Sequence, residues 1–105
     1  MLDIYRVVLE VIVELRPVLA ELLRKSPVLQ DQLERALLTV VLAIGEGSRS
    51  RGRNRPAHYQ RGAASMDESI AAIDAALAFG YLAAFDEGTR AKMKHVVAVL
   101  VKVSR

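Results

Sequence analysis

The chain has 105 residues, of which 52% are hydrophobic and 26% charged, with a formal net charge of +3 and no cysteine. This length suits one domain, residues 1–105, and the composition is that of an ordinary globular protein. The lack of cysteine excludes disulfide bonds, thiolate metal sites and a cysteine nucleophile. Charged residues interrupt the apolar first 24 positions, so we expect neither a signal peptide nor a membrane span there, and a cytoplasmic location.

The first predicted element is a helix from about Asp3 to Arg24. Apolar residues recur along it at helical spacing: Ile4, Val8, Val11, Leu15, Val18 and Leu22. Pro17 lies inside this helix and lacks a backbone N–H, so we predict a kink near residues 13–16.

Ser26 and Pro27 predict the start of a second helix, because a serine hydroxyl caps a first turn and proline fits the first helical position. One face of this helix is apolar or small: Leu29, Leu33, Ala36, Leu37, Val40, Ile44 and Gly47. Gly52, Asn54 and Pro56 predict a break after it, and Pro56 is expected to open the third helix.

The third helix is rich in alanine, which allows neighbouring backbones to approach closely, and Gly80 is predicted to lie near its end. Asp86 is predicted to cap a fourth helix that runs to about Val103. Residues 95–103 are β-branched, but a lone strand would have no partner, so this segment is interpreted as helical.

Long helices with short connections predict an all-α fold, an antiparallel up-down-up-down four-helix bundle. The first and fourth helices carry more apolar residues than the single stripe that a bundle helix needs. The surplus residues are Val7, Leu9, Ile12, Val13, Leu19 and Leu23, and then Val96, Val97, Val99, Leu100, Val101 and Val103. Because this surplus would be exposed on a monomer, we predict a homo-oligomer. The alternative is a small bundle that wraps the first helix tightly in its middle.

Catalytic and metal-binding patterns are missing from the sequence. Metal-binding bundles use Glu-x-x-His motifs, and neither His58 nor His95 follows a glutamate at that spacing. The stretch GEGSRSRG lacks the Lys-Ser/Thr ending of a phosphate-binding loop and follows a predicted helix instead of a strand. Glu46, Asp67 and Glu68 could form paired carboxylates, but we expect Glu46 and Glu68 instead to accept hydrogen bonds or to pair with arginines at a helix junction. We therefore expect no enzyme activity, no cofactor and no bound metal.

The strongest remaining signal is an excess of positive charge between the second and third helices. Thirteen positions hold five arginines: Arg49, Arg51, Arg53, Arg55 and Arg61. A continuing helix would pair them four residues apart on one face, and an extended segment would place the first four on one side. Either row could neutralise the phosphates of RNA or DNA, because the arginine fork donates two hydrogen bonds. The alternatives are salt bridges to another subunit or a partner protein, and a merely solvated turn.

The run QDQLERALLTVVLAIGEGSR resembles the signature of small bacterial four-helix-bundle proteins called ribosomal-RNA intervening-sequence proteins. Gln32, Leu33, Arg35 and Ala36 match the first part of that pattern, and Glu46, Gly47 and Arg49 match the second. Tyr59, the stretch Ala64–Glu68 and the stretch Ala78–Tyr81 resemble its third helix. The match covers roughly residues 27–82. The usual Asn-Ile-Ala before Glu-Gly is Ala43-Ile44-Gly45 here, and the arginines after it are more numerous than in the family.

This resemblance implies an antiparallel bundle that assembles into a ring-like homopentamer without catalytic activity. A related protein, the accessory variability determinant of diversity-generating retroelements, is a basic pentamer that contacts a reverse transcriptase and binds nucleic acid. By analogy, nucleic acid and a reverse transcriptase or another protein are expected partners of this chain.

Overall fold

The computed structural model describes residues 3–52 and 54–105, and within these ranges every regular element is an α-helix. The helices are α1 (Ile4–Glu14), α2 (Arg16–Lys25), α3 (Pro27–Arg49), α4 (Asn54–Ala78) and α5 (Glu87–Val103). They form an elongated body of 43 × 24 × 20 Å. The prediction of an all-α fold is therefore confirmed, with five helices where four were expected.

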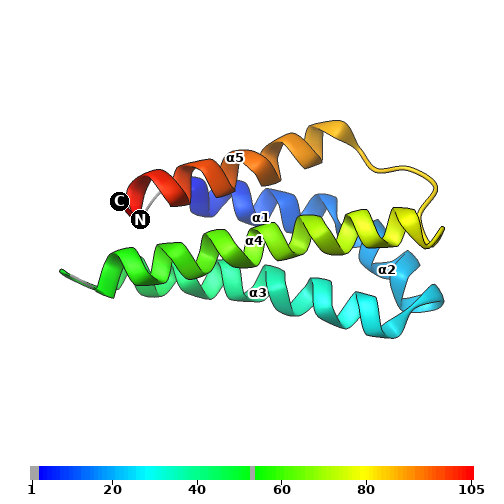
Figure 1. Ribbon diagram of the computed structural model, residues 1–105, viewed down its shortest axis with the longest axis horizontal. Helices are drawn as coiled ribbons and strands as arrows, with labels where there is room; N and C mark the ends of the chain where they lie inside the picture. Colours follow the sequence, from blue (N-terminus) through cyan, green and yellow to red (C-terminus); the bar gives the residue numbers. More distant parts are fainter. Residues whose placement is uncertain (1–2, 53) are drawn as a thin grey trace.

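Figure 1 shows how the helices run relative to one another. The long helices α3 and α4 form an antiparallel hairpin, α1 and α2 run beside α3, and α5 returns along α4 and α1. As a result, the α3–α4 turn, the start of α1 and the end of α5 all lie at one end of the molecule.

The predicted kink in the first helix divides it into two helices. Leu15 separates α1 from α2, and its backbone N–H donates to both Val11 and Ile12. Pro17 occupies the first turn of α2. Because proline cannot donate to the carbonyl four residues earlier, the helical ladder is interrupted at this point. The Leu15 side chain nevertheless stays fully buried, so the break keeps the apolar stripe continuous.

The predicted helix ends are confirmed by their capping contacts. The Ser26 hydroxyl accepts a hydrogen bond from the Leu29 N–H at 3.3 Å, and Asp86 Oδ2 accepts one from the Thr89 N–H at 2.9 Å. Gly80 adopts φ +80° just after α4. Its N–H donates to Leu77, and the next N–H in the chain donates to the carbonyl of Ala76, which is the Schellman pattern. Pro56 lies inside the first turn of α4, which begins two residues earlier than predicted.

The core is formed by the predicted apolar faces of all the helices. Its fully buried members come from every helix and include Leu15, Leu22, Leu33, Ile44, Met66, Ile73, Met93 and Leu100. The predicted apolar surplus is partly absorbed by this core, because Val7, Ile12, Val97 and Val99 pack against it. Other apolar side chains remain exposed: Leu9, Val13, Leu23, Val28, Leu38, Leu42, Phe79, Val101 and Val103. The outer face of α5 also carries basic groups, with Lys94, His95 and Lys102 exposed.

Candidate nucleic-acid interface

The arginine-rich segment forms a short turn between α3 and α4. Helix α3 ends at Arg49, Arg51 lies in the turn, and Arg55 lies in the first turn of α4. Arg53 lies outside the described residues. Neither arrangement expected from the sequence, a continued helix or an extended row, describes this segment, because the chain reverses direction within it. The arginines are consequently divided among different surroundings.

Arg55 holds the end of α3. Its Nε donates to the carbonyl oxygens of Gly47 at 3.2 Å and of Ser50 at 3.1 Å. The last carbonyls of a helix have no partner within the helix, and they carry its negative dipole end. A guanidinium at this place satisfies them and has a favourable charge. Arg55 therefore links the start of α4 to the end of α3, although Arg55 itself is exposed to solvent.

Arg61 is paired with Glu46 across the α3–α4 hairpin. Its guanidinium Nη2 lies 2.8 Å from Glu46 Oε2. His58 Nδ1 lies 3.2 Å from the same oxygen, but this nitrogen is buried and is not aligned to form a hydrogen bond with it. The hydrogen bond from Arg61, above all, lowers the pKa of Glu46, with further attraction from His58 and Arg49. The expected pairing with an arginine at a helix junction is confirmed for Glu46 but not for Glu68, which is exposed and forms no ion pair within residues 3–52 and 54–105.

Just beside this ion pair, the backbone of α3 makes its closest approach to a side chain of α4. Tyr59 is 4% exposed, and its ring lies against Gly47. A Cβ atom added to Gly47 would lie 2.3 Å from Tyr59 Cε1, which is far inside van der Waals contact. The sequence placed Gly47 on the apolar face of its helix, but it did not indicate which side chain would fill the space above it. Glu46 and Gly47 thus both have structural roles in joining the hairpin.

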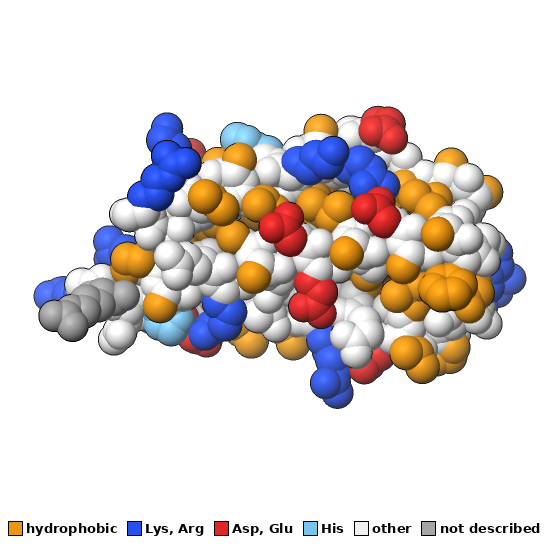
Figure 2. Space-filling view, in the orientation of Figure 1, with side chains coloured by type: hydrophobic (Ala, Val, Ile, Leu, Met, Phe, Trp, Pro, Cys, Tyr) orange, Lys and Arg blue, Asp and Glu red, His pale blue; other side chains and the backbone are white. Residues whose placement is uncertain are grey.

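Arg49 and Arg51 are the predicted site residues whose charge is least engaged. Both are exposed, and neither forms an ion pair with any residue in 3–52 or 54–105. Lys102 and Arg105 at the end of α5 are also exposed, and α5 ends at the same end of the molecule. Figure 2 shows Lys and Arg side chains on the α3–α4 turn and near the end of α5. We call this region, Arg49, Arg51, Arg55, Lys102 and Arg105, the basic end.

The ion pair in the hairpin has a testable consequence for pH. Replacing Arg61 by methionine is expected to raise the pKa of Glu46 toward its ordinary value, because the strongest donor to the carboxylate is removed. A lowered pKa in the folded state means that ionised Glu46 stabilises the protein above its unfolded pKa, and that this contribution is lost as pH falls through the folded pKa. The Arg61→Met variant should therefore lose less stability on acidification. NMR titration of the Glu46 side-chain carbon measures the shift.

The matched control is Arg51→Met, which removes the same charge from the same segment without touching Glu46. It should leave the pKa of Glu46 close to that of the unmodified protein. An equal rise in both variants would mean that the general positive potential of the turn, and not the contact with Arg61, sets this pKa.

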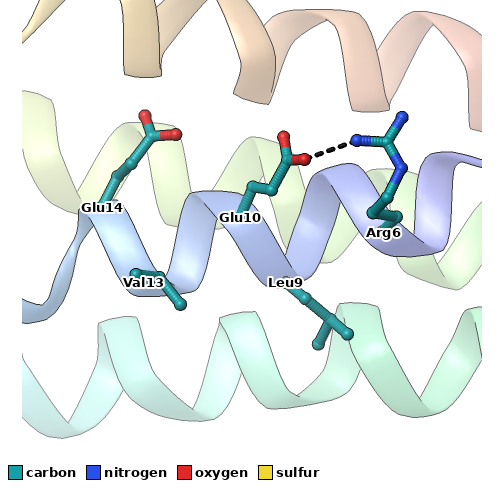
Figure 3. A pocket seen from close by; sticks show the side chains of 5 residues that line it. All are labelled: Arg6, Leu9, Glu10, Val13 and Glu14. Atoms are coloured by element: carbon teal, nitrogen blue, oxygen red, sulfur yellow. Dashed lines mark hydrogen bonds and ion pairs between the residues drawn. The ribbon is translucent and has the colours of Figure 1, made fainter.

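A second surface was not predicted from the sequence. Leu38 and Leu42 of α3 are 54% and 51% exposed, beside a shallow depression between α3 and the α1–α2 segment. Figure 3 shows Leu9 and Val13 on the side of α1 that faces α3, whereas the charged side chains of α1 point toward α5. Surplus apolar residues were expected only in the first and last helices. The sequence does contain a signal for this surface in α3, because Leu38 and Leu42 are four residues apart and lie outside its core stripe.

No family model, no curated protein and no solved structure matches this chain. In the part of the chain that the structure describes, no helix is long and apolar enough to cross a membrane.

Proposed function

We propose that this chain is a non-enzymatic helical protein that binds the phosphates of RNA or DNA through its basic end. The observation that carries the proposal is the exposure of Arg49 and Arg51 without a carboxylate partner among the described residues. The segment 46–62 holds five arginines, and Glu46, its one acidic residue, is occupied by Arg61. Positive charge that the protein does not neutralise itself is available to phosphate groups.

The fold part of the proposal is a four-helix bundle in which α1 and α2 together form one broken helix. The buried Leu15 at the break supports it, because the apolar stripe passes through the kink. Glu46, Gly47 and Tyr59 support the resemblance to the intervening-sequence family, since each has a structural role in joining α3 to α4. Self-association also belongs to the proposal and is supported by the exposed leucines. The resemblance implies five copies.

The test is binding of a labelled structured RNA and of a DNA duplex over a series of salt concentrations. The unmodified protein is expected to bind with an affinity that falls steeply with salt. An Arg49→Gln/Arg51→Gln variant should bind more weakly, with a salt slope smaller by roughly 0.7–0.9 for each phosphate that is no longer neutralised. This loss of affinity should exceed the loss caused by removing two positive charges elsewhere on the protein, because both arginines lie in the proposed phosphate-binding surface.

The control variant is Arg16→Gln/Arg24→Gln, which removes the same charge from exposed positions far from the turn. It should keep the original salt slope. Absence of binding by the unmodified protein at low salt contradicts the proposal, and so does an equal weakening in both variants. The mass of each variant is measured first, so that a change of assembly is not mistaken for weaker phosphate binding.

A further inference from the structure

The outward face of α3 carries residues spaced alternately by four and three positions. They are Asp31, Arg35, Leu38, Leu42, Gly45 and Arg49, and we call this row the α3 seam. This spacing is that of the a and d positions in a coiled coil, which are the positions that meet a partner helix. The core of the protein lies on another face of α3, formed by Leu33, Leu37, Val40 and Ile44. The seam is therefore a second face of α3, on which Asp31, Arg35, Leu38, Leu42 and Arg49 are exposed and Gly45 is covered by Arg49.

The exposure of the seam supports a contact with another chain. Leu38 and Leu42 are each more than half exposed at its centre. A helix that packs on one side only normally has polar residues on its outer face, so neighbouring exposed leucines there indicate an intermolecular contact. At the end of the seam the Arg49 guanidinium folds back over Gly45, with its nitrogens 3.8 and 3.9 Å from the place a Gly45 Cβ would occupy. The charge of Arg49 is thus held along the seam.

The order of residues along the seam makes it complementary to itself. If two copies of α3 lie antiparallel, centred between Leu38 and Leu42, each Leu38 lies opposite Leu42 of the other copy. The same alignment places Arg35 opposite Gly45.

The charges at the ends of the seam select this direction. The antiparallel alignment places Asp31 opposite Arg49, and the two-fold symmetry forms this pair of opposite charges twice. Within one chain Asp31 pairs with Arg35 at 3.0 Å, but both side chains are more than half exposed, so Asp31 remains accessible to a second cation. A parallel alignment would instead place Asp31 against Asp31 and Arg49 against Arg49, which repel.

We propose that a second copy of this chain docks on the α3 seam in an antiparallel, two-fold dimer. The proposal rests on the self-association included in the proposed function and names its surface. Leu9 and Val13 of α1 flank the seam, and the depression lined by Ile12, Leu38 and Val41 continues it, so the apolar contact is broader than one helix. The charges at both ends of the leucine pair select the second copy over an unrelated apolar partner.

The symmetry of this contact determines the number of subunits. A contact of one face with itself closes after two copies, whereas a ring of five requires two different faces that fit each other. The α3 seam thus predicts a dimer in place of the pentamer implied by the family resemblance. In the dimer Arg49 pairs with Asp31 of the other copy, so the phosphate surface of each basic end then depends on Arg51, Arg55, Lys102 and Arg105.

The first measurement is the mass of the protein in solution by sedimentation equilibrium, without nucleic acid. The unmodified chain should have twice the monomer mass, and Leu38→Glu/Leu42→Glu should be a folded monomer by circular dichroism. The control Leu23→Glu/Phe79→Glu, at two exposed apolar positions that are not on α3, should remain a dimer. A monomeric or pentameric unmodified protein overturns the proposal, as does a dimer that survives the change at the seam.

A charge exchange tests the alignment itself. Asp31→Arg and Arg49→Asp should each weaken the dimer by about tenfold, because each replaces two attractive contacts with repulsive ones. The variant carrying both changes should regain most of the affinity, since the opposite charges then face each other in reversed order. Failure of the double variant to recover overturns the antiparallel alignment.

Cysteine cross-linking gives an independent measure of orientation, because the natural chain contains no cysteine. An equimolar mixture of Leu38→Cys and Leu42→Cys chains should form disulfide-linked heterodimers on mild oxidation, and either chain alone should link far less. Efficient linking of each chain to itself would indicate a parallel seam and overturn the proposal. All these measurements omit nucleic acid, so a failure of phosphate binding leaves their outcome unchanged, and a monomeric protein could still bind RNA.

Discussion

Replacing Tyr59 by alanine is expected to lower the free energy of unfolding by about 3–5 kcal/mol, the range found when a buried aromatic side chain is truncated. Tyr59 is 4% exposed and belongs to the core cluster, although it lies only one turn from the solvated arginine segment. Its ring covers the backbone of α3 at Gly47, so truncation opens a cavity between the two longest helices. Chemical denaturation monitored by circular dichroism measures the loss.

The control for this change is Tyr59→Phe, which keeps the ring and removes only the hydroxyl. It should cost far less than the alanine variant, because the contact with Gly47 is made by ring carbons. Both proteins are compared at the same concentration, since self-association adds to apparent stability. A loss below about 1 kcal/mol for Tyr59→Ala would mean that the ring does not hold the hairpin together.

Gly47→Ala is expected to destabilise the protein by about 1–3 kcal/mol, the usual cost of overpacking a well-filled contact. This direction is unusual inside a helix, where alanine is favoured over glycine by about 1 kcal/mol. The reason is steric, because the added Cβ would lie 2.3 Å from Tyr59 Cε1 and the buried ring has no solvent to move into. Either α3 and α4 separate or the ring leaves its position, and both outcomes weaken packing.

Gly45→Ala is the matched control, two residues earlier in the same helix. The nearest atoms to its added Cβ are the ends of the flexible Arg49 side chain, at 3.8 and 3.9 Å. Gly45→Ala should therefore stabilise the protein by up to about 1 kcal/mol, opposite in sign to Gly47→Ala. Combining Gly47→Ala with Tyr59→Ala should remove most of the cost of the glycine change, as expected for residues in direct contact. Equal effects at both glycines would contradict the steric account.

The two contacts across the hairpin explain why a Glu-Gly pair stands just before the arginines. Glu46 faces α4 and holds Arg61, whereas Gly47 permits the close approach of Tyr59. Two of the predicted site arginines therefore stabilise the hairpin: Arg61 pairs with Glu46, and Arg55 donates to carbonyl oxygens at the end of α3. The surface available for phosphates is therefore concentrated on the turn and not spread along the helices, and Arg49 and Arg51 are the residues to change in the binding test.

The helices and most of their ends could be predicted because their causes are local. Ser26, Asp86 and Gly80 act on backbone groups within a few residues, and Pro17 interrupts a ladder that spans four positions. Spacing along the chain is sufficient for such effects. The sequence located the kink in the first helix, but it did not indicate that the chain bends sharply enough there to divide this helix into α1 and α2.

Which arginines form hydrogen bonds or ion pairs could not be predicted, because the turn brings their partners close to them. Arg61 and Glu46 are 15 positions apart, and Arg55 reaches back to Gly47 only because the chain reverses between them. Similarly, the sequence indicated surplus apolar residues, but burial of Ile12 and Val97 depends on how closely neighbouring helices pack.

By itself, the sequence determined that this protein is all-helical, where its caps and kink lie, and that its excess of positive over negative charge lies in one connection. Each of these follows from local backbone chemistry or from counting side chains. Only the tertiary structure decided which arginines are engaged by Glu46 and by the end of α3, and that Leu38 and Leu42 stay uncovered. Those outcomes depend on the angle and distance between helices, which arise from packing between residues far apart in the chain.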